Sequence, residues 1–120
     1  MIKSDAKFVY VAGPLTQGEP GHNLHVAMVA GHAVMDMGHV PYVPHLTVIM
    51  SLTQPRDYEE WIAADLAVIT RCDALWRLPG TSPGGDREVE FAESIGVPVV
   101  YTADELEDLL NTVVGAECVL

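Results

Sequence analysis

Short apolar runs alternate with helix-like segments along the chain, and this alternation constrains the fold more than any other feature. The first run, residues 7–13, is β-branched and aromatic and ends on glycine, as expected of a strand buried on both faces. Further strands are predicted at residues 39–47, interrupted by proline, 73–78 and 97–101. Helices are predicted from residue 21 or 23 to about 38, from near 57, over 87–95 and from 103. Such alternation predicts an α/β, flavodoxin-like or Rossmann-like three-layer fold with a small parallel sheet.

Length and charge limit the number of domains and the class of partner. A chain of 120 residues with 49% hydrophobic content suffices for one core, so we expect a single domain over residues 1–120. Seventeen acidic and six basic residues give a net charge of −11, and the sequence has no cluster of Lys and Arg. Because such a surface repels a phosphate backbone, no polymeric nucleic acid partner is expected.

The sequence also predicts a compartment and the absence of a metal. Cys72 and Cys118 form neither a close pair nor a Cys/His ligand spacing, which favours a reducing compartment. His22 and His25 have no third ligand nearby in sequence, so we interpret them as surface residues and expect no metal site. The N-terminus does not resemble a secretory signal and no apolar run is long enough to span a bilayer, so a cytoplasmic protein without a membrane partner is expected.

Glu88 stands on the apolar side of the helix predicted over residues 87–95. At about 100° per residue it falls in the sector formed by Phe91, Ala92 and Ile95, at i+3, i+4 and i+7. Glu90 and Glu93 fall on the opposite side. One of three glutamates is therefore predicted to point inward.

Asp65 repeats this anomaly on the preceding predicted helix, where it shares a face with Tyr58, Trp61, Ile62, Val68 and Ile69. Singly, each acid has a structural explanation: Asp65 bonded by backbone donors or Arg71, and Glu88 as a first-turn acid that suits a helix N-terminus. Two acids on apolar faces near the loop end of one sheet together favour acid–base or nucleophilic chemistry, because partial desolvation shifts a carboxyl pKa. Trp61 and Trp76 are interpreted as core residues.

Three loop features are weaker signals of ligand binding. The segment GPLTQG, which begins at Gly13, can wrap a phosphate or sugar, but it matches no nucleotide-binding motif and a plain loop is favoured. Ser82 with Gly84 and Gly85 offers a hydroxyl and backbone N–H groups to an anion, although such turns more often only cap a helix. His45, between Pro44 and Leu46, is equally consistent with a substrate contact and a structural role.

Four segments together resemble the nucleoside 2-deoxyribosyltransferase superfamily, which includes the nucleoside 5'-monophosphate N-glycosidases. They are VYVAGPL at the first strand, VPHLT after the second, DLAVITRCDALWRLPG through the third, and S-x-x-x-x-x-E-x-x-x-A-x-x-x-G-x-P-V from Ser82 to Val99. The resemblance covers roughly residues 8–101, and its last segment is the most specific. Glu88 occupies the position of the family's nucleophile.

This resemblance implies a role for each of three residues. Glu88 attacks the anomeric carbon to give a glycosyl-enzyme, Tyr10 holds its carboxylate, and Asp65 is the acid near the departing base or the sugar. A carboxylate on a first turn is expected to stay ionised and fixed. Ser82 favours a 5'-phosphate, because an acid at this position repels one. The first loop, residues 14–23, has no arginine to pair with that phosphate, which leaves Arg56 or Arg87.

The predicted activity is hydrolysis of the N-glycosidic bond of a (deoxy)nucleoside 5'-monophosphate, with a small-molecule nucleotide or nucleoside as ligand and no cofactor. One alternative is a nucleoside 2-deoxyribosyltransferase, in which a second base replaces water. Another is a nucleotide-binding module without turnover. The helix predicted from residue 21 or 23 to about 38 is apolar almost all round, so we also expect a homodimer or larger homo-oligomer.

Overall fold

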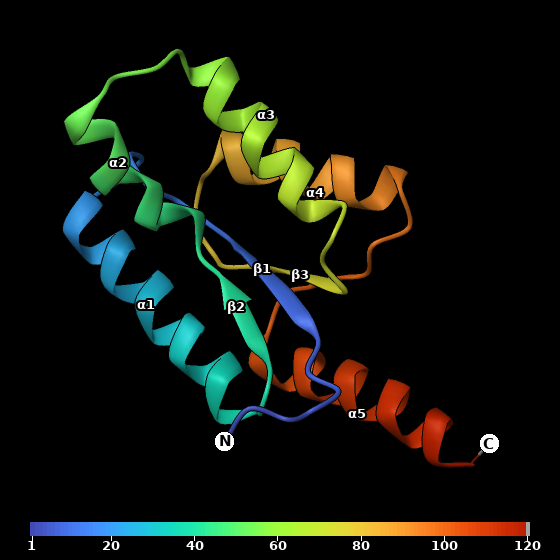
Figure 1. Ribbon diagram of the computed structural model, residues 1–120. Coiled ribbons are helices and arrows are strands. Elements are labelled where there is room, and N and C mark those ends of the chain that lie inside the picture. Colours follow the sequence, from blue (N-terminus) through green and yellow to red (C-terminus); the bar gives the residue numbers. More distant parts are fainter. Residues whose placement is uncertain (120) are drawn as a thin grey trace.

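The computed structural model describes residues 1–119, with side chains to residue 111, as strands interleaved with helices (Figure 1). In chain order the elements are β1 (Phe8–Ala12), α1 (Pro20–Asp36), β2 (Val40–Tyr42), the 3-10 helix η1 (Pro44–Leu46), α2 (Thr47–Thr53), α3 (Tyr58–Ile69), β3 (Ala74–Arg77), α4 (Pro83–Ser94), β4 (Val99–Val100) and α5 (Ala103–Val119).

The four strands form one parallel sheet in the order β2-β1-β3-β4. The predicted three-layer α/β fold with a small parallel sheet is confirmed. From β1 the chain passes through α1 to β2, whereas from β3 it passes through α4 to β4, so the connections diverge between the two central strands. In α/β sheets this divergence leaves a crevice at the carboxyl ends of the strands, where ligands bind.

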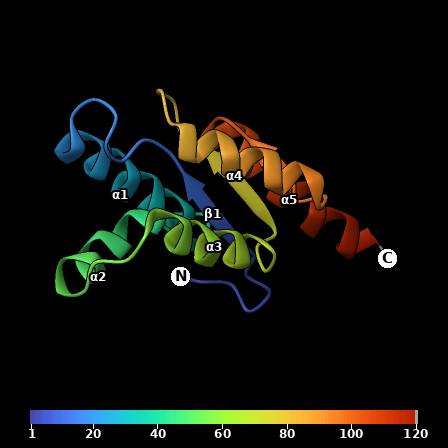
Figure 2. The same ribbon diagram turned by 90° about the horizontal axis from the view of Figure 1, so that it is seen from above.

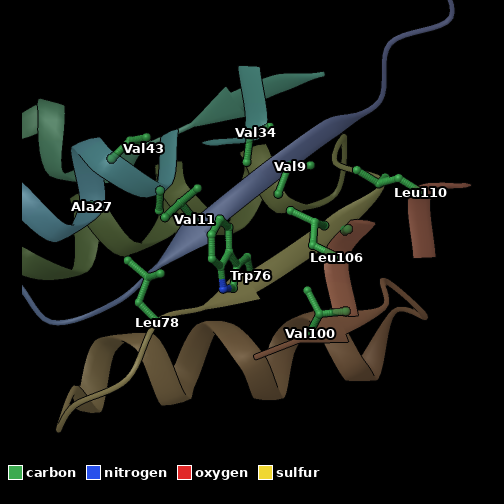
Figure 3. Packing of buried hydrophobic residues seen from close by; sticks show 12 residues of the cluster. Val9, Val11, Ala27, Val34, Val43, Trp76, Leu78, Val100, Leu106 and Leu110 are labelled. Atoms are coloured by element: carbon green, nitrogen blue, oxygen red, sulfur yellow. The ribbon is translucent and has the colours of Figure 1, made fainter. Parts of the chain in front are cut away.

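Alternating residues of the strands serve two separate cores. Val9 and Val11 of β1 pack with Trp76 of β3 under α1 and α5, as Figure 3 shows. Tyr10 and Ala12 face the opposite way and pack with residues of α3 and α4. Figures 1 and 2 show α3 and α4 side by side on that second face, running in the same direction. Residues 9–12 are fully buried, which confirms a strand covered on both faces.

Two segments differ from the sequence prediction, and proline is the reason in both. The strand predicted over residues 39–47 ends at Tyr42, and residues 44–53 form η1 and α2, with Pro44 as the first residue of η1. Helix α4 begins at Pro83, four residues before the predicted start at Arg87. Proline lacks an N–H group, but the first residue of a helix has no intrahelical acceptor for one, so proline is well tolerated at this position.

Four further features relate to expectations from the sequence: the surface of α1, the cysteines, metal ligands and membrane spans. Helix α1 buries Ala27, Ala30, Gly31 and Val34 but exposes Leu24, Val29 and Met35. Cys72 is a half-buried free thiol, and Cys118 lies outside the residues whose side chains are described. Among the described residues no group of three metal-ligating side chains is found. Within residues 1–119 no helix has both the length and the apolarity needed to cross a bilayer.

The core assignment predicts unequal effects of two leucine substitutions. Leu106 of α5 is fully buried, whereas Leu52 of α2 is 80% exposed. Leu106→Ala should lower the free energy of unfolding by about 3 kcal/mol, because it removes buried apolar atoms and leaves a cavity. Leu52→Ala should change it by less than about 0.5 kcal/mol. Urea unfolding followed by circular dichroism measures both, and equal losses would contradict the assignment.

Candidate active site

The first turn of α4 sets the direction of Glu88. Ser82 is the N-cap residue, and its Oγ accepts a hydrogen bond from the Gly85 N–H at 3.0 Å. The buried residues of the helix are Gly85, Glu88 and Ala92, spaced by three and four positions. They form one stripe that faces the sheet. Glu88 is only 5% exposed, as its position on the predicted apolar face required.

Tyr10, at the centre of the sheet, donates a hydrogen bond from its hydroxyl to Glu88 Oε2. Its side chain is fully buried, and its ring stacks on that of Tyr42, its neighbour on β2, with centroids 5.5 Å apart. Burial is the main reason that the pKa of Tyr10 is raised, and the negative charge of Glu88 adds to it. The phenol therefore stays protonated and remains a donor.

Burial raises the pKa of Glu88 to about 7. The hydrogen bond from Tyr10 and the charge of Arg77 lower it, while the charge of Asp65 raises it. The expectation that a helix N-terminus keeps this carboxylate ionised is wrong. Because α4 begins at Pro83, Glu88 lies in the second turn, whereas the effect of a helix terminus fades within the first. Desolvation is the larger effect.

Asp65 lies half-buried on α3, and burial raises its pKa to about 6. Its Oδ1 atom is buried and has no hydrogen-bond partner within the described part of the chain. The structural explanation offered for this acid, backbone donors or Arg71, is therefore not met at that oxygen. An unsatisfied buried carboxyl oxygen costs stability, which is a reason to look for a role in chemistry.

Both acids line a cleft of about 580 Å³ at the carboxyl ends of β1 and β3. The predicted residues that line it are Gly13, His45, Asp65, Ser82, Gly84, Gly85 and Glu88. Tyr10 does not line the cleft but lies behind Glu88, to which it is bonded. The fold therefore brings all eight predicted residues to one place, from four separate segments of the sequence.

His45 fixes one wall of the cleft. Its Nε2 lies 2.9 Å from the carbonyl oxygen of Pro14, and a carbonyl only accepts, so Nε2 carries the proton. Burial lowers the pKa of this histidine, which favours the neutral ring. His45 is thus structural, because it joins η1 to the loop after β1, and it also lines the cleft.

Gly84 and Gly85 lie so close to neighbouring side chains that a larger residue would not fit, but this turn has few free backbone N–H groups. A Cβ atom on Gly85 would lie 2.9 Å from Ser82 Oγ, and one on Gly84 would lie 3.1 Å from the Tyr58 hydroxyl. The N–H groups of Gly85 and Asp86 both donate to Ser82, and Pro83 has none. The predicted set of free backbone donors at this turn is therefore reduced.

Some lining residues were not predicted. Helix α2 contributes Thr47, Val48 and Ser51, which were missed because no helix was expected there. Trp61 lines the cleft instead of filling the core. Its position one turn before Asp65 on the same face was an available signal.

The two arginines proposed as phosphate partners differ in their position relative to the cleft. Arg56 lines the cleft and pairs with Glu60 at 2.8 Å. Arg87 binds both carboxylate oxygens of Glu59, at 3.0 and 2.9 Å, and does not line the cleft.

Comparison with known proteins identifies the family and the fold. The model of a family described as a domain of unknown function, DUF7768, matches residues 7–102. The chain belongs to this family. A search of curated proteins found no match to this DUF7768 chain.

Two similar solved structures are 2-deoxyribosyltransferases by name. One, from Bacillus psychrosaccharolyticus, has a TM-score of 0.57 and 22% identity, over 77% of this chain and 69% of that one. The other, from Leishmania mexicana, has a TM-score of 0.60 and 18% identity, over 79% of this chain and 63% of that one. At such identities the likeness shows the fold alone: the DUF7768 chain has the fold of these proteins.

The raised pKa of Glu88 predicts how its substitution changes stability with pH. A folded-state pKa of about 7, above the ordinary 4.5, gives stability that is present below pH 4.5 and lost as the pH rises through 7. Glu88→Gln cannot ionise and escapes this loss. It should be more stable than the parent at pH 8, by up to about 3 kcal/mol, and similar to it at pH 4.

Urea unfolding at both pH values measures this difference. Glu93→Gln, an exposed position on the same helix, is the matched control and should follow the parent at both. A Glu88→Gln variant with the same stability difference at pH 4 and pH 8 would show that the carboxyl is not desolvated.

Proposed function

We propose that this protein hydrolyses the N-glycosidic bond of a nucleoside 5'-monophosphate, with Glu88 as the nucleophile. The observation that carries the proposal is a buried carboxyl at the wall of a cleft, held by the hydroxyl of Tyr10. A tyrosine bond to Oε2 fixes the group and leaves Oε1 for attack. An oriented nucleophile near its substrate replaces one difficult displacement by two easier ones.

The reaction has two steps. Ionised Glu88 forms a bond to the anomeric carbon while the bond from that carbon to the base nitrogen breaks, and the base leaves with a proton. Water then attacks the anomeric carbon of the glycosyl ester and gives a proton to the acid that protonated the base, which releases the sugar and restores both carboxyl groups to their starting state. No electrons are exchanged with a second compound, so this displacement requires no redox cofactor, and we propose none.

Asp65 is proposed as the acid of the first step or as a contact to the sugar. Its pKa of about 6 lets it hold a proton in part of the molecules at neutral pH. The negative charge of Asp65 disfavours ionisation of Glu88, so one proton is readily kept on the pair. The proposed step requires that proton on Asp65, whereas the higher pKa of Glu88 places it on Glu88 in the free protein, so substrate binding must shift it to Asp65.

Other lining groups support a nucleotide as the ligand. Trp61 and Tyr58 offer flat surfaces on which a base can stack. The Ser82 hydroxyl and the Arg56 guanidinium can donate hydrogen bonds to a phosphate. We further propose a cytoplasmic homodimer or larger assembly, which the exposed side chains of Leu24, Val29 and Met35 on α1 support.

Base exchange is the second candidate function, favoured because both similar structures are named as 2-deoxyribosyltransferases. The chemistry up to the glycosyl ester is the same. The two functions differ only in whether water or a second base attacks that ester.

Release of free base tests the nucleophile. Incubation of a panel of nucleosides and their 5'-monophosphates with the protein should give free base by liquid chromatography. Glu88→Gln should lower the rate by at least about 1,000-fold, because the covalent route is removed. Glu90→Gln, an exposed site on the same helix, should keep it. Equal rates for Glu88→Gln and the parent would refute the assignment, and binding without release by the parent would favour a non-catalytic module.

Product analysis with a second base separates hydrolysis from transfer. With a reactive nucleotide and an excess of an isotopically labelled base, we expect free sugar phosphate as the main product, whatever the base concentration. A labelled nucleotide or nucleoside that replaces the free sugar as the base concentration rises would show a transferase instead.

A further inference from the structure

Arg77 is a buried cation for which the reaction described above has no role. It is the last residue of β3, stands beside Ala12 of β1 and has a side chain only 9% exposed. The strand residues Tyr10 and Ala12 on this face are uncharged. A guanidinium in such a place must be paired, because desolvation of a charge is costly.

The pairing of Arg77 ties the loop after β3 to the start of α4. Its Nη1 donates to the carbonyl of Leu78, and its Nη2 donates to the Gly80 carbonyl at 2.9 Å and to Asp86 Oδ1 at 3.0 Å. The side chain of Asp86 is 74% exposed, so this ion pair reaches from the core to the solvent. One side chain therefore fixes both the loop and the first turn of the helix.

The guanidinium also lies directly beneath the turn that precedes Glu88. A Cβ atom on Gly85 would be 3.0 Å from Arg77 Nε, so only glycine fits between helix and arginine. Glu88 follows Gly85 on the same stripe of α4, three residues on, about 4.5 Å along the helix axis. Gly85, which packs on the guanidinium, thus precedes Glu88 by about one helical turn.

Helix stability alone does not explain this arrangement. A positive charge near the N-terminus of a helix opposes the helix dipole, and its burial adds a second cost. Three groups act on the titration of Glu88: Tyr10 of β1, Asp65 of α3 and Arg77 of β3. Among these three, Arg77 is the cation, and its charge favours the ionised form that a nucleophile needs.

We propose that Arg77 is a positioning residue for Glu88: it fixes the turn that aims the carboxyl at the cleft and supplies the positive charge that keeps it ionisable. The catalytic importance of Arg77 rests on the proposed function. Its electrostatic effect on Glu88 does not, and that effect is measurable in a protein without turnover.

Carbon-13 NMR of the glutamate carboxyl groups tests the proposal without any substrate. The Glu88 signal is identified by its loss in Glu88→Gln, and its titration midpoint is measured in the parent and four variants. Arg77→Met removes the positive charge. Arg77→Lys keeps the charge but loses the planar guanidinium group with its several donors. Asp86→Asn removes the carboxylate that pairs with Arg77. Arg71→Met, at an exposed position, is the matched control.

Arg77→Met should raise the midpoint by about one pH unit or more, because a cation near a desolvated carboxyl is removed. Arg77→Lys should raise it by less than half as much. Asp86→Asn should lower it, because Arg77 then acts on Glu88 without a competing anion. The control should match the parent. An unchanged midpoint in Arg77→Met contradicts the proposal; if that variant does not fold, an unchanged midpoint in Asp86→Asn does so.

The pH dependence of kcat/KM provides a second test. If the parent releases base, the rise of kcat/KM with pH should move to higher pH in Arg77→Met by the same amount as the NMR midpoint. If the parent releases none, the proposed function fails, while the NMR titration still decides whether Arg77 acts on Glu88.

Discussion

A carboxyl group buried against the hydroxyl of a tyrosine on the central strand is the interaction on which this site depends. Burial removes water from the Glu88 carboxyl and raises its pKa. The hydrogen bond from the Tyr10 hydroxyl replaces part of that lost hydration. Burial of this carboxyl costs stability when it ionises, so packing does not account for its position. The proposed role as nucleophile does, since a desolvated and oriented carboxylate is a better nucleophile than a hydrated one.

Strand β1 and helix α4 bring Tyr10 and Glu88 together on one side of the sheet. Strand β1 is buried on both faces, so alternate residues serve different layers, and Tyr10 points toward α3 and α4. Helix α4 brings Glu88 to that side because Ser82 caps it and Gly85 allows it to lie close over Arg77. The diverging connections of β1 and β3 leave the cleft at the same end of the sheet.

Features carried by local periodicity were predictable from the sequence. The alternation of strands and helices predicted the α/β fold, and the spacing of apolar residues around Glu88 and Asp65 predicted which acids face inward. Features that depend on a helix start or on distant contacts were not predictable. The start of α4 at Pro83 places Glu88 in the second turn, not in the expected first turn, and the Gly85 amide caps the helix through Ser82, which is the more common role given for such a turn. Arg77 carried no periodic signal, because its partners are backbone carbonyls and one exposed acid.

The central claim is a covalent bond between sugar and Glu88, and peptide mass spectrometry tests it most directly. A nucleotide whose sugar carries fluorine at C2' destabilises the oxocarbenium-like transition state and slows loss of the glycosyl group from the enzyme. After incubation with a reactive base as leaving group, the account predicts a mass increase of one fluorinated glycosyl unit on the peptide that contains Glu88. Attachment to another residue, or an unlabelled protein that nevertheless turns over the unmodified nucleotide, would contradict it.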